Sequence, residues 1–169
     1  MKRCHWVNEN NPLYVKYHDE EWCKPSHEDN YLFEMLMLES FQAGLSWECI
    51  LNKRENFKVA FDNFDYHKIA NYNENKIKEL LENTGIIRNK LKIAASINNA
   101  KVFMTIQKEF TSFDNYIWSF TNNKIIKNES EVPIPSSPLS DEISKDLKKR
   151  GMKFVGTTII YSYLQAIVI

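Results

Sequence analysis

One carboxylate in the first third of the chain lies on an apolar stripe, where a charged side chain is unusual. Glu39 lies at helical spacing from three apolar residues on one stripe, Leu32, Met35 and Leu36. The stripe would turn the Glu39 side chain into the protein. Because carboxylates are rarely buried without a partner, Glu39 is a candidate functional group.

Several aromatic side chains close to Glu39 in sequence could form the walls of a pocket. They are Trp6, Tyr14, Tyr17, Trp22 and Trp47. Flat rings stack on a nucleic-acid base that has been turned out of its helix, and one carboxylate can recognise or stabilise the polar edge of that base. The alternative is that these rings belong to the hydrophobic core and that Glu39 is partly exposed.

A basic segment near the C-terminus has the layout of a helix–hairpin–helix element. A helix is followed by a turn at Gly151 and by a second helix that starts near Gly156 and Thr157. Backbone N–H groups at a helix start can bind a phosphate, and neighbouring cations add attraction. The basic residues in and before the turn are Lys148, Lys149, Arg150 and Lys153. The alternative is an ordinary helical hairpin with a solvated basic face.

Metal chemistry has only weak support from the residues themselves. Cys4 and His18 are good zinc-ligand types, but a structural zinc site needs four ligands. No C-x-x-C or H-x-x-x-H spacing completes a site from the remaining candidates, which are His5, Cys23, His27, Cys49 and His67. A lone cysteine near an N-terminus is more often a small core residue. Phosphate-loop, dinucleotide-binding, serine-hydrolase and metalloprotease motifs are missing.

Helical periodicity and capping residues predict a chain of short helices that would position these groups. Helices are expected from Pro12 after the cap Asn11, over 29–41, from the cap Ser46 through Arg54, over 74–83 after the cap Asn73 with an end at Gly85, over 88–108, over 112–120, from Ser140 to Gly151, and from Gly156-Thr157 to the end. Residues 122–138 carry three prolines and are expected to form a surface loop. The fold class predicted is all-α, with a helical hairpin at roughly 140–168.

Composition bounds the rest of the interpretation. The 169 residues are 43% hydrophobic, which suits a single domain over 1–169 with one core. Only four glycines are present, which disfavours a turn-rich all-β fold. The formal net charge is zero, and this counts mildly against a nucleic-acid partner. With neither a secretory signal nor a long apolar run, the chain is expected to be soluble and cytoplasmic, with no membrane partner.

Many short motifs occur in a fixed order along nearly the whole chain. They are Arg3-Cys4-x-Trp6-Val7, Pro12-Leu13-Tyr14-x-x-Tyr17-His18-Asp19-x-Glu21-Trp22, Leu32-Phe33-Glu34-Met35, Leu38-Glu39, Gln42-Ala43-Gly44-Leu45-Ser46-Trp47, Lys53-Arg54-Glu55-Asn56 and Lys149-Arg150-Gly151-x-Lys153-Phe154-Val155-Gly156-Thr157-Thr158. On these motifs the sequence resembles the DNA-3-methyladenine glycosylase I family. The resemblance implies an all-α helix–hairpin–helix DNA glycosylase fold, with a cleft between two helical lobes.

The resemblance also implies roles for the candidate residues. Tyr17 and Glu39 would hydrogen-bond the methylated adenine and act as the catalytic pair, while Trp47 would stack on the base. Two further rings, Tyr14 and Trp22, would line the same pocket, with Trp6 close to the sugar.

Contacts with DNA are implied in two places. The turn formed by Gln42, Gly44 and Leu45 would be a wedge that fills the gap left by the flipped nucleotide. The hairpin would bind the phosphate backbone through Lys149, Lys153, Gly156 and Thr157.

Zinc is implied only in part. Members of the family continue past the last helix into a tail that supplies a His and a Cys to a zinc site shared with Cys4 and His18, whereas this sequence stops at Ile169. Cys23 stands where the family usually has glycine.

The function implied is monofunctional hydrolysis of the N-glycosidic bond of 3-methyladenine, in double-stranded DNA that contains alkylated adenine, by a monomer. Residues 157–169 contain no Asp or Glu, which is consistent with catalysis driven by binding rather than by an acid on the last helix. Two alternatives are a catalytically decayed module that binds DNA or lesions without cutting, and a small helical protein-interaction domain.

Overall fold

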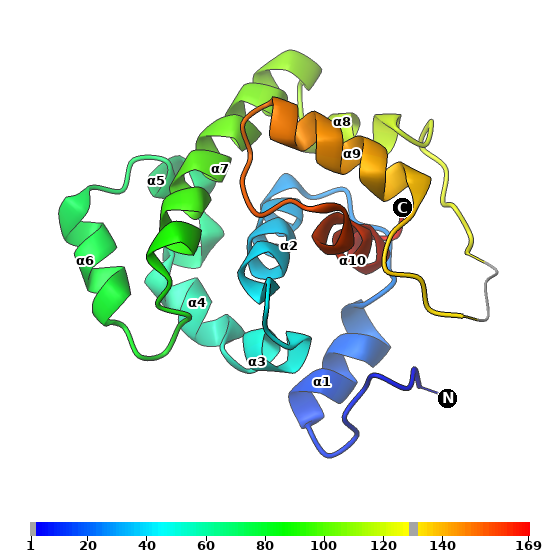
Figure 1. The fold of residues 1–169 in the computed structure, drawn as a ribbon, viewed down its shortest axis with the longest axis horizontal. Coiled ribbons are helices and arrows are strands. Elements are labelled where there is room, and N and C mark those ends of the chain that lie inside the picture. Colours follow the sequence, from blue (N-terminus) through cyan, green and yellow to red (C-terminus); the bar gives the residue numbers. More distant parts are fainter. Residues whose placement is uncertain (1–2, 129–131) are drawn as a thin grey trace.

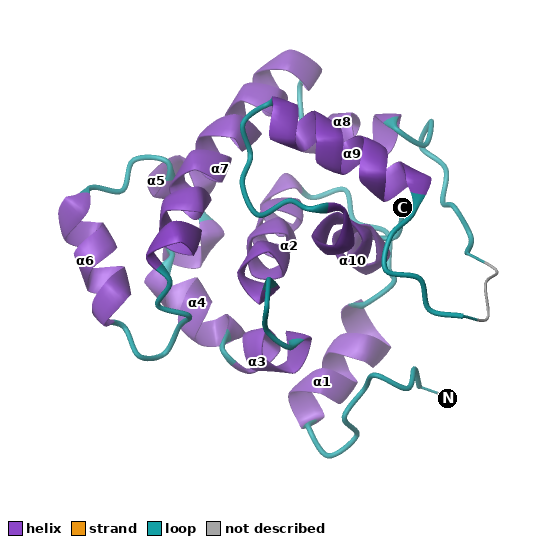
Figure 2. Ribbon diagram, viewed as in Figure 1, coloured by secondary structure: helices purple, strands orange, loops and turns teal. Residues whose placement is uncertain are grey.

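A computed structural model describes residues 3–128 and 132–169, and every regular element in these ranges is a helix (Figure 2). The α-helices are α1 (Pro12–Lys16), α2 (Asp29–Gln42), α3 (Trp47–Asn52), α4 (Arg54–Ala60), α5 (Tyr66–Ile69), α6 (Glu74–Glu82), α7 (Lys90–Phe110), α8 (Phe113–Ser119), α9 (Pro138–Lys149) and α10 (Thr157–Ile167). A π-helical turn, η1 (Tyr17–Glu21), follows α1, and a 3₁₀ turn, η2 (Asp62–Phe64), follows α4.

Helix α2 lies at the centre of the molecule. It packs against α3, α7, α8 and α10, with α7 on one side of it and α10 on the other (Figure 1). Apolar residues occur around its whole circumference. From Leu32 to Phe41, every residue except Glu34 is buried. The predicted burial of the stripe formed by Leu32, Met35 and Leu36 is therefore confirmed. A helix buried over most of its length is a rigid support for the polar groups it carries.

Helices α9 and α10 form the predicted helical hairpin and pack side by side (Figure 1). The Ser144 hydroxyl donates to the Val155 carbonyl at 2.7 Å, and the hydroxyls of Ser140 and Thr157 lie 2.8 Å apart. These bonds satisfy polar groups where the two helices meet, so the hairpin is held by specific contacts as well as by burial.

Two predicted helix boundaries are wrong. Ser140 does not open α9, because Ser137 is the N-cap and Pro138 the first helical residue. Ser137 and Ser140 form a reciprocal capping box, in which Ser140 takes the inner position. The helix predicted from Ser46 through Arg54 is two helices, with Lys53 as the residue between α3 and α4.

The segment between α4 and α6 contains elements that periodicity did not predict. Residues 62–64 have positive φ and form the 3₁₀ turn, and Asp65 caps the single turn of α5 by accepting from the backbone N–H of His67. One turn is too short for a helical repeat to register in the sequence.

Among the described residues, no helix has both the length and the apolar character needed to cross a bilayer.

Candidate functional site

The candidate pocket residues, scattered over the first 47 positions of the sequence, line one cavity of about 290 Å³. They come from different elements, since Trp6 precedes α1, Tyr14 lies on α1, Tyr17 on η1 and Trp47 at the start of α3. The full lining is Trp6, Tyr14, Tyr17, Trp22, Glu39, Gln42, Trp47, Ser162 and Gln165. The structure thus brings together every residue that sequence analysis assigned to base binding.

The Glu39 carboxyl is the most unusual group in this cavity. The residue is only 3% exposed, and its Oε2 has no hydrogen-bond partner in the described part of the chain. Burial raises the pKa of Glu39 to about 8, because the low-dielectric surroundings disfavour the charged form. A buried acceptor without a donor is costly, so this group is poised to bind a ligand.

Tyr17 lies beside Glu39 and remains a neutral phenol. Its ring is 3% exposed and packs against Trp47, with ring centroids 5.4 Å apart. Burial, and to a smaller extent the charge of Glu39, raise the pKa of Tyr17 far above its ordinary value. At neutral pH its hydroxyl can therefore donate or accept a hydrogen bond without ionising.

The π-helical turn explains how Tyr17 and Trp22 both reach the cavity. The backbone N–H of Trp22 donates to the carbonyl of Tyr17 at 2.8 Å, which is the wider π-helical spacing. Arg54 fastens this turn to α2, because it donates to Glu21 at 2.8 Å and to Glu34 at 2.7 Å. In the sequence Arg54 stands out only as part of the motif Lys53-Arg54-Glu55-Asn56, and its role becomes visible only through these contacts.

The remaining wall consists of packed rings. Trp6 lies 5.4 Å from Tyr14 and 5.1 Å from Trp22, measured between ring centroids. His18 stacks on Trp22 at 5.6 Å with an interplanar angle of 17°. The indole Nε1 of Trp47 is buried and, like Glu39 Oε2, lacks a partner within the residues described. The cavity therefore combines aromatic walls with a buried carboxyl, which suits a flat polar ligand.

Sequence analysis missed Ser162 and Gln165 as pocket residues. Both lie on α10, which is otherwise largely apolar, and they are three residues apart on one face. A polar pair at helical spacing in an apolar helix was the available signal. Only the packing of α10 against α2 shows that the pair faces the same cavity as Glu39.

The turn after α2 presents an apolar tip to solvent. Gly44 has φ +79°, a conformation that favours glycine, and space for a side chain around it is open. The backbone N–H of Leu45 donates to the Gln42 carbonyl at 2.6 Å, and Leu45 is 39% exposed. We call residues 42–45 the wedge turn.

The basic residues at the hairpin turn, residues 150–156, differ in whether their charges are available to a ligand. Lys149 and Lys153 are exposed, and Gly156 is the N-cap of α10 with open space around it. Arg150, in contrast, binds Asp146 at 2.7 Å and Glu109 at 2.7 Å, so it stabilises the fold instead of presenting a free cation. The Thr157 hydroxyl contacts α9, which leaves its backbone as the group free to bind an anion.

The proposed metal ligands lie together but provide only part of a site. The backbone N–H of Cys4 lies 3.4 Å from His18 Nε2, and Asp19 Oδ1 lies 2.8 Å from His18 Nδ1. A carboxylate on the second ring nitrogen is the arrangement that orients a metal-ligating histidine. Within residues 3–128 and 132–169, no group of three or more Cys, His, Asp or Glu side chains could hold a metal ion. Cys23, which is exposed, does not complete one.

The fold and the site together define a class of protein. A solved structure of 3-methyladenine DNA glycosylase I, 46% identical, superimposes on 98% of this chain with a TM-score of 0.91, and its helices match the helices of the described residues, so the fold is that of a helix–hairpin–helix DNA glycosylase. Comparison with known proteins agrees, because the family described as methyladenine glycosylase matches residues 6–169. The chain belongs to this methyladenine glycosylase family.

Individual relatives are similar over nearly their whole length. DNA-3-methyladenine glycosylase 1 of Escherichia coli strain K12 is 45% identical over 170 residues, covering 98% of this chain and 90% of the relative. The DNA-3-methyladenine glycosylase of Haemophilus influenzae is 42% identical, covering 97% and 90%. A solved structure of 3-methyladenine DNA glycosylase I from Staphylococcus aureus superimposes with a TM-score of 0.93 at 34% identity, covering 99% of this chain and 90% of the other.

The burial of Glu39 predicts a specific dependence of stability on pH. Its pKa is about 8 in the folded chain against 4.5 ordinarily, so between these values the folded protein holds a proton that the unfolded chain releases. This contribution to stability is complete below pH 4.5 and is lost as pH rises toward 8, by at most about 1.4 kcal/mol per pH unit. Glu39→Gln removes the titrating group, so the variant should become the more stable protein at alkaline pH.

Urea denaturation of both proteins across this pH range measures the difference. Glu55→Gln, on the exposed surface of α4, is the matched control and should follow the wild type. Parallel curves for the wild type and Glu39→Gln would show that Glu39 is ionised in the folded protein.

Proposed function

We propose that this protein hydrolyses the N-glycosidic bond of 3-methyladenine in double-stranded DNA, as a monofunctional glycosylase of base excision repair. The observation that carries the proposal is the buried Glu39 carboxyl, which lines an aromatic cavity of about 290 Å³ and whose Oε2 has no hydrogen-bond partner among the residues described. The similarity to proteins named for 3-methyladenine excision supports the choice of lesion. The solved relative from S. aureus is described as a structure of 3-methyladenine recognition.

Methylation at N3 gives adenine a positive charge and weakens its bond to the sugar. The base can leave without a strong general acid, so the task of the protein is to bind the cation and stabilise an oxocarbenium-like transition state. As the bond from C1′ to N9 breaks, its electron pair goes to the base, which departs as neutral 3-methyladenine. Water then adds to C1′ and loses a proton, which leaves an abasic site.

Glu39 and Tyr17 are assigned to the polar edge of the base, and Trp47 to its face. A cation near the Glu39 carboxyl favours the ionised form, so binding of the methylated base should expel the proton that burial retains. The walls formed by Tyr14, Trp22 and Trp6 add electron-rich faces that attract a cation. An uncharged adenine would leave Glu39 protonated and would gain less from the site, which provides discrimination.

Two surfaces beside this cavity are assigned to contacts with DNA, the wedge turn and the hairpin turn. Leu45 at the tip of the wedge turn would fill the space that the flipped nucleotide leaves in a duplex. Lys149, Lys153 and the start of α10 at Gly156 would bind phosphates.

The first test is excision by Glu39→Gln. Loss of a charge-assisted hydrogen bond should slow release of 3-methyladenine by roughly ten- to a hundred-fold. Single-turnover release from alkylated duplex DNA is the measurement, with Glu55→Gln as the control that retains wild-type rate. Equal release rates for Glu39→Gln and the wild type would show that Glu39 does not recognise the methylated base. A wild type that binds alkylated DNA without releasing base would instead support the decayed binding module.

The second test concerns the hairpin. Lys149→Ala and Lys153→Ala should each weaken binding to all DNA sequences alike and reduce the slope of log affinity against log salt by about one unit. The control is Lys78→Ala on α6, which lies on the far side of α7 from the hairpin (Figure 1). Unchanged salt slopes in both hairpin variants would argue that the duplex does not contact this turn.

We also propose that Cys4 and His18 are two ligands of a structural zinc ion. Their proximity and the carboxylate of Asp19 on the second ring nitrogen support this assignment. Because the described residues supply only this pair, the 169-residue chain should bind zinc weakly, and Cys4→Ser should abolish that binding while Cys49→Ser should not. Competition against a chromogenic chelator measures the affinity. Tight stoichiometric binding that survives Cys4→Ser would refute the assignment.

A further inference from the structure

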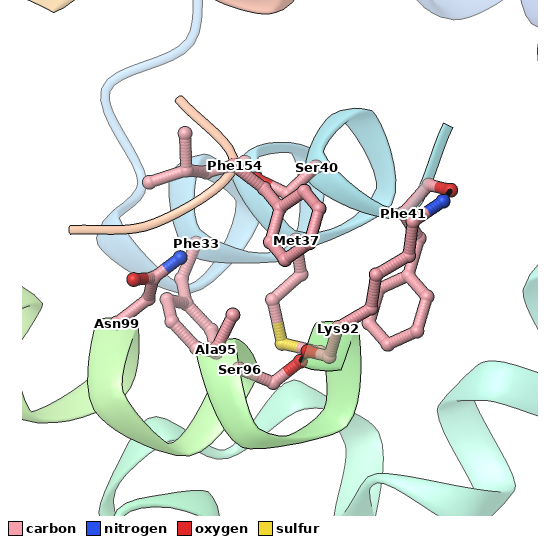
Figure 3. Close-up of a pocket in the computed structure, with 10 residues that line it drawn as sticks. Phe33, Met37, Ser40, Phe41, Lys92, Ala95, Ser96, Asn99 and Phe154 are labelled. Carbon is pink, nitrogen blue, oxygen red and sulfur yellow. Dashed lines mark hydrogen bonds between the residues drawn. The ribbon is translucent and has the colours of Figure 1, made fainter. Parts of the chain in front are cut away.

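Helix α7 carries three buried polar side chains on the face that it packs toward α2. Lys92, Ser96 and Asn99 follow one another at helical spacing and are 7%, 3% and 3% exposed. Figure 3 shows them along one side of α7, facing residues of α2 and of the hairpin turn. Ser96 bonds within its own helix, to the Lys92 carbonyl. Lys92 and Asn99, in contrast, bond to segments far away in sequence.

Lys92 binds the end of α2. Its ammonium donates to the carbonyl of Phe41 at 2.7 Å and to the carbonyl of Ala43 at 2.6 Å. These are carbonyls that a helix end leaves without partners inside the helix, and a cation there also interacts favourably with the helix dipole. Ala43 is itself part of the wedge turn, so Lys92 fixes the direction in which the chain leaves α2 toward Leu45.

Asn99 binds the hairpin turn in the same way. Its side-chain oxygen accepts from the backbone N–H of Lys153 at 2.9 Å, and its amide donates to the carbonyl of Lys153 at 2.9 Å. Its neighbour Asn98 donates to the Gly151 carbonyl at 2.7 Å. Phe154 in this turn has φ 54°, a conformation that non-glycine residues rarely adopt, so the turn needs outside support to keep its shape.

One helix therefore holds both turns assigned to DNA. Lys92 and Asn99 are seven residues apart, which corresponds to about 10 Å along the axis of a rigid α-helix. A buried ammonium and a buried amide are expensive to desolvate, so burial against α2 alone does not account for Lys92 and Asn99. What an apolar side chain could not do is fix the backbone of an exposed turn at a defined place.

We infer that Lys92 and Asn99 are positioning residues, which set the separation between the wedge turn and the hairpin turn so that both engage one DNA duplex together. The inference rests on the proposed function, in which these two turns contact DNA. Neither residue lines the cavity around Glu39. Replacing Lys92 or Asn99 should therefore slow the release of 3-methyladenine from duplex DNA and leave binding of the free base unchanged.

Lys92→Met and Asn99→Leu test this inference, with Lys101→Met on the exposed side of α7 as the matched control. Because both changes are at buried positions, Asn98→Ala is added as a milder variant at a half-buried site. Two quantities are measured for each protein: the affinity and stoichiometry for free 3-methyladenine by calorimetry, and single-turnover release of 3-methyladenine from duplex and from single-stranded oligonucleotides.

We expect binding of the free base to match the wild type within about twofold, because the cavity is untouched. Release from duplex DNA should fall by roughly ten- to a hundred-fold for Lys92→Met and Asn99→Leu, as misplacement of a distant contact predicts. The loss should be smaller for Asn98→Ala, and in single strands, where no opposing strand has to be engaged, all variants should approach the wild type.

Wild-type release from duplex DNA by both buried variants overturns the inference. So does a loss that appears equally in free-base stoichiometry and in both oligonucleotides, since that result means only that less protein is folded. If the wild type itself neither binds free 3-methyladenine nor releases it, the proposed function fails instead, and the two failures are thereby distinguished.

Discussion

The proposed chemistry depends on one carboxyl group, that of Glu39, which is buried in the central helix. Glu39 is buried because α3, α7, α8 and α10 pack around α2, and its Oε2 finds no donor among the described residues. An apolar residue at this position would be less costly to bury, so the fold tolerates Glu39 against its own stability. The apolar contacts around the rest of α2, such as Phe33 against Phe103 at 5.1 Å, offset that cost.

The cost of burial also gives the site its selectivity in the proposed reaction. With a pKa of about 8, the Glu39 carboxyl is mostly uncharged at neutral pH, and a cationic base beside it would shift the balance toward the carboxylate. The rings of Tyr17 and Trp47 pack against each other in the wall of the cavity, and apolar surroundings strengthen the attraction between opposite charges. Burial that destabilises the free protein therefore increases the preference for a methylated, charged base.

Long-range polar contacts hold the elements around this pocket. Arg54 joins the π-helical turn to α2 through Glu21 and Glu34, and so fixes the turn that carries Tyr17. Lys92 and Asn99 do the same for the two exposed turns. In each case a side chain from one helix binds groups on a segment that has little local structure of its own. Rigid helices thereby position turns that could not hold their conformation alone.

The sequence by itself determined the helical class, the N-caps Asn11, Ser46 and Asn73, and the burial of Glu39, because caps and the 3.6-residue period depend on neighbours in the chain. The family motifs supplied the pocket aromatics. Only the tertiary structure decided the roles of Ser162 and Gln165, the pairing of Arg150 and the function of Lys92. Lys92 bonds to a carbonyl 51 residues away, and no local pattern records such a partner. Contacts of that range exist only once the helices have packed.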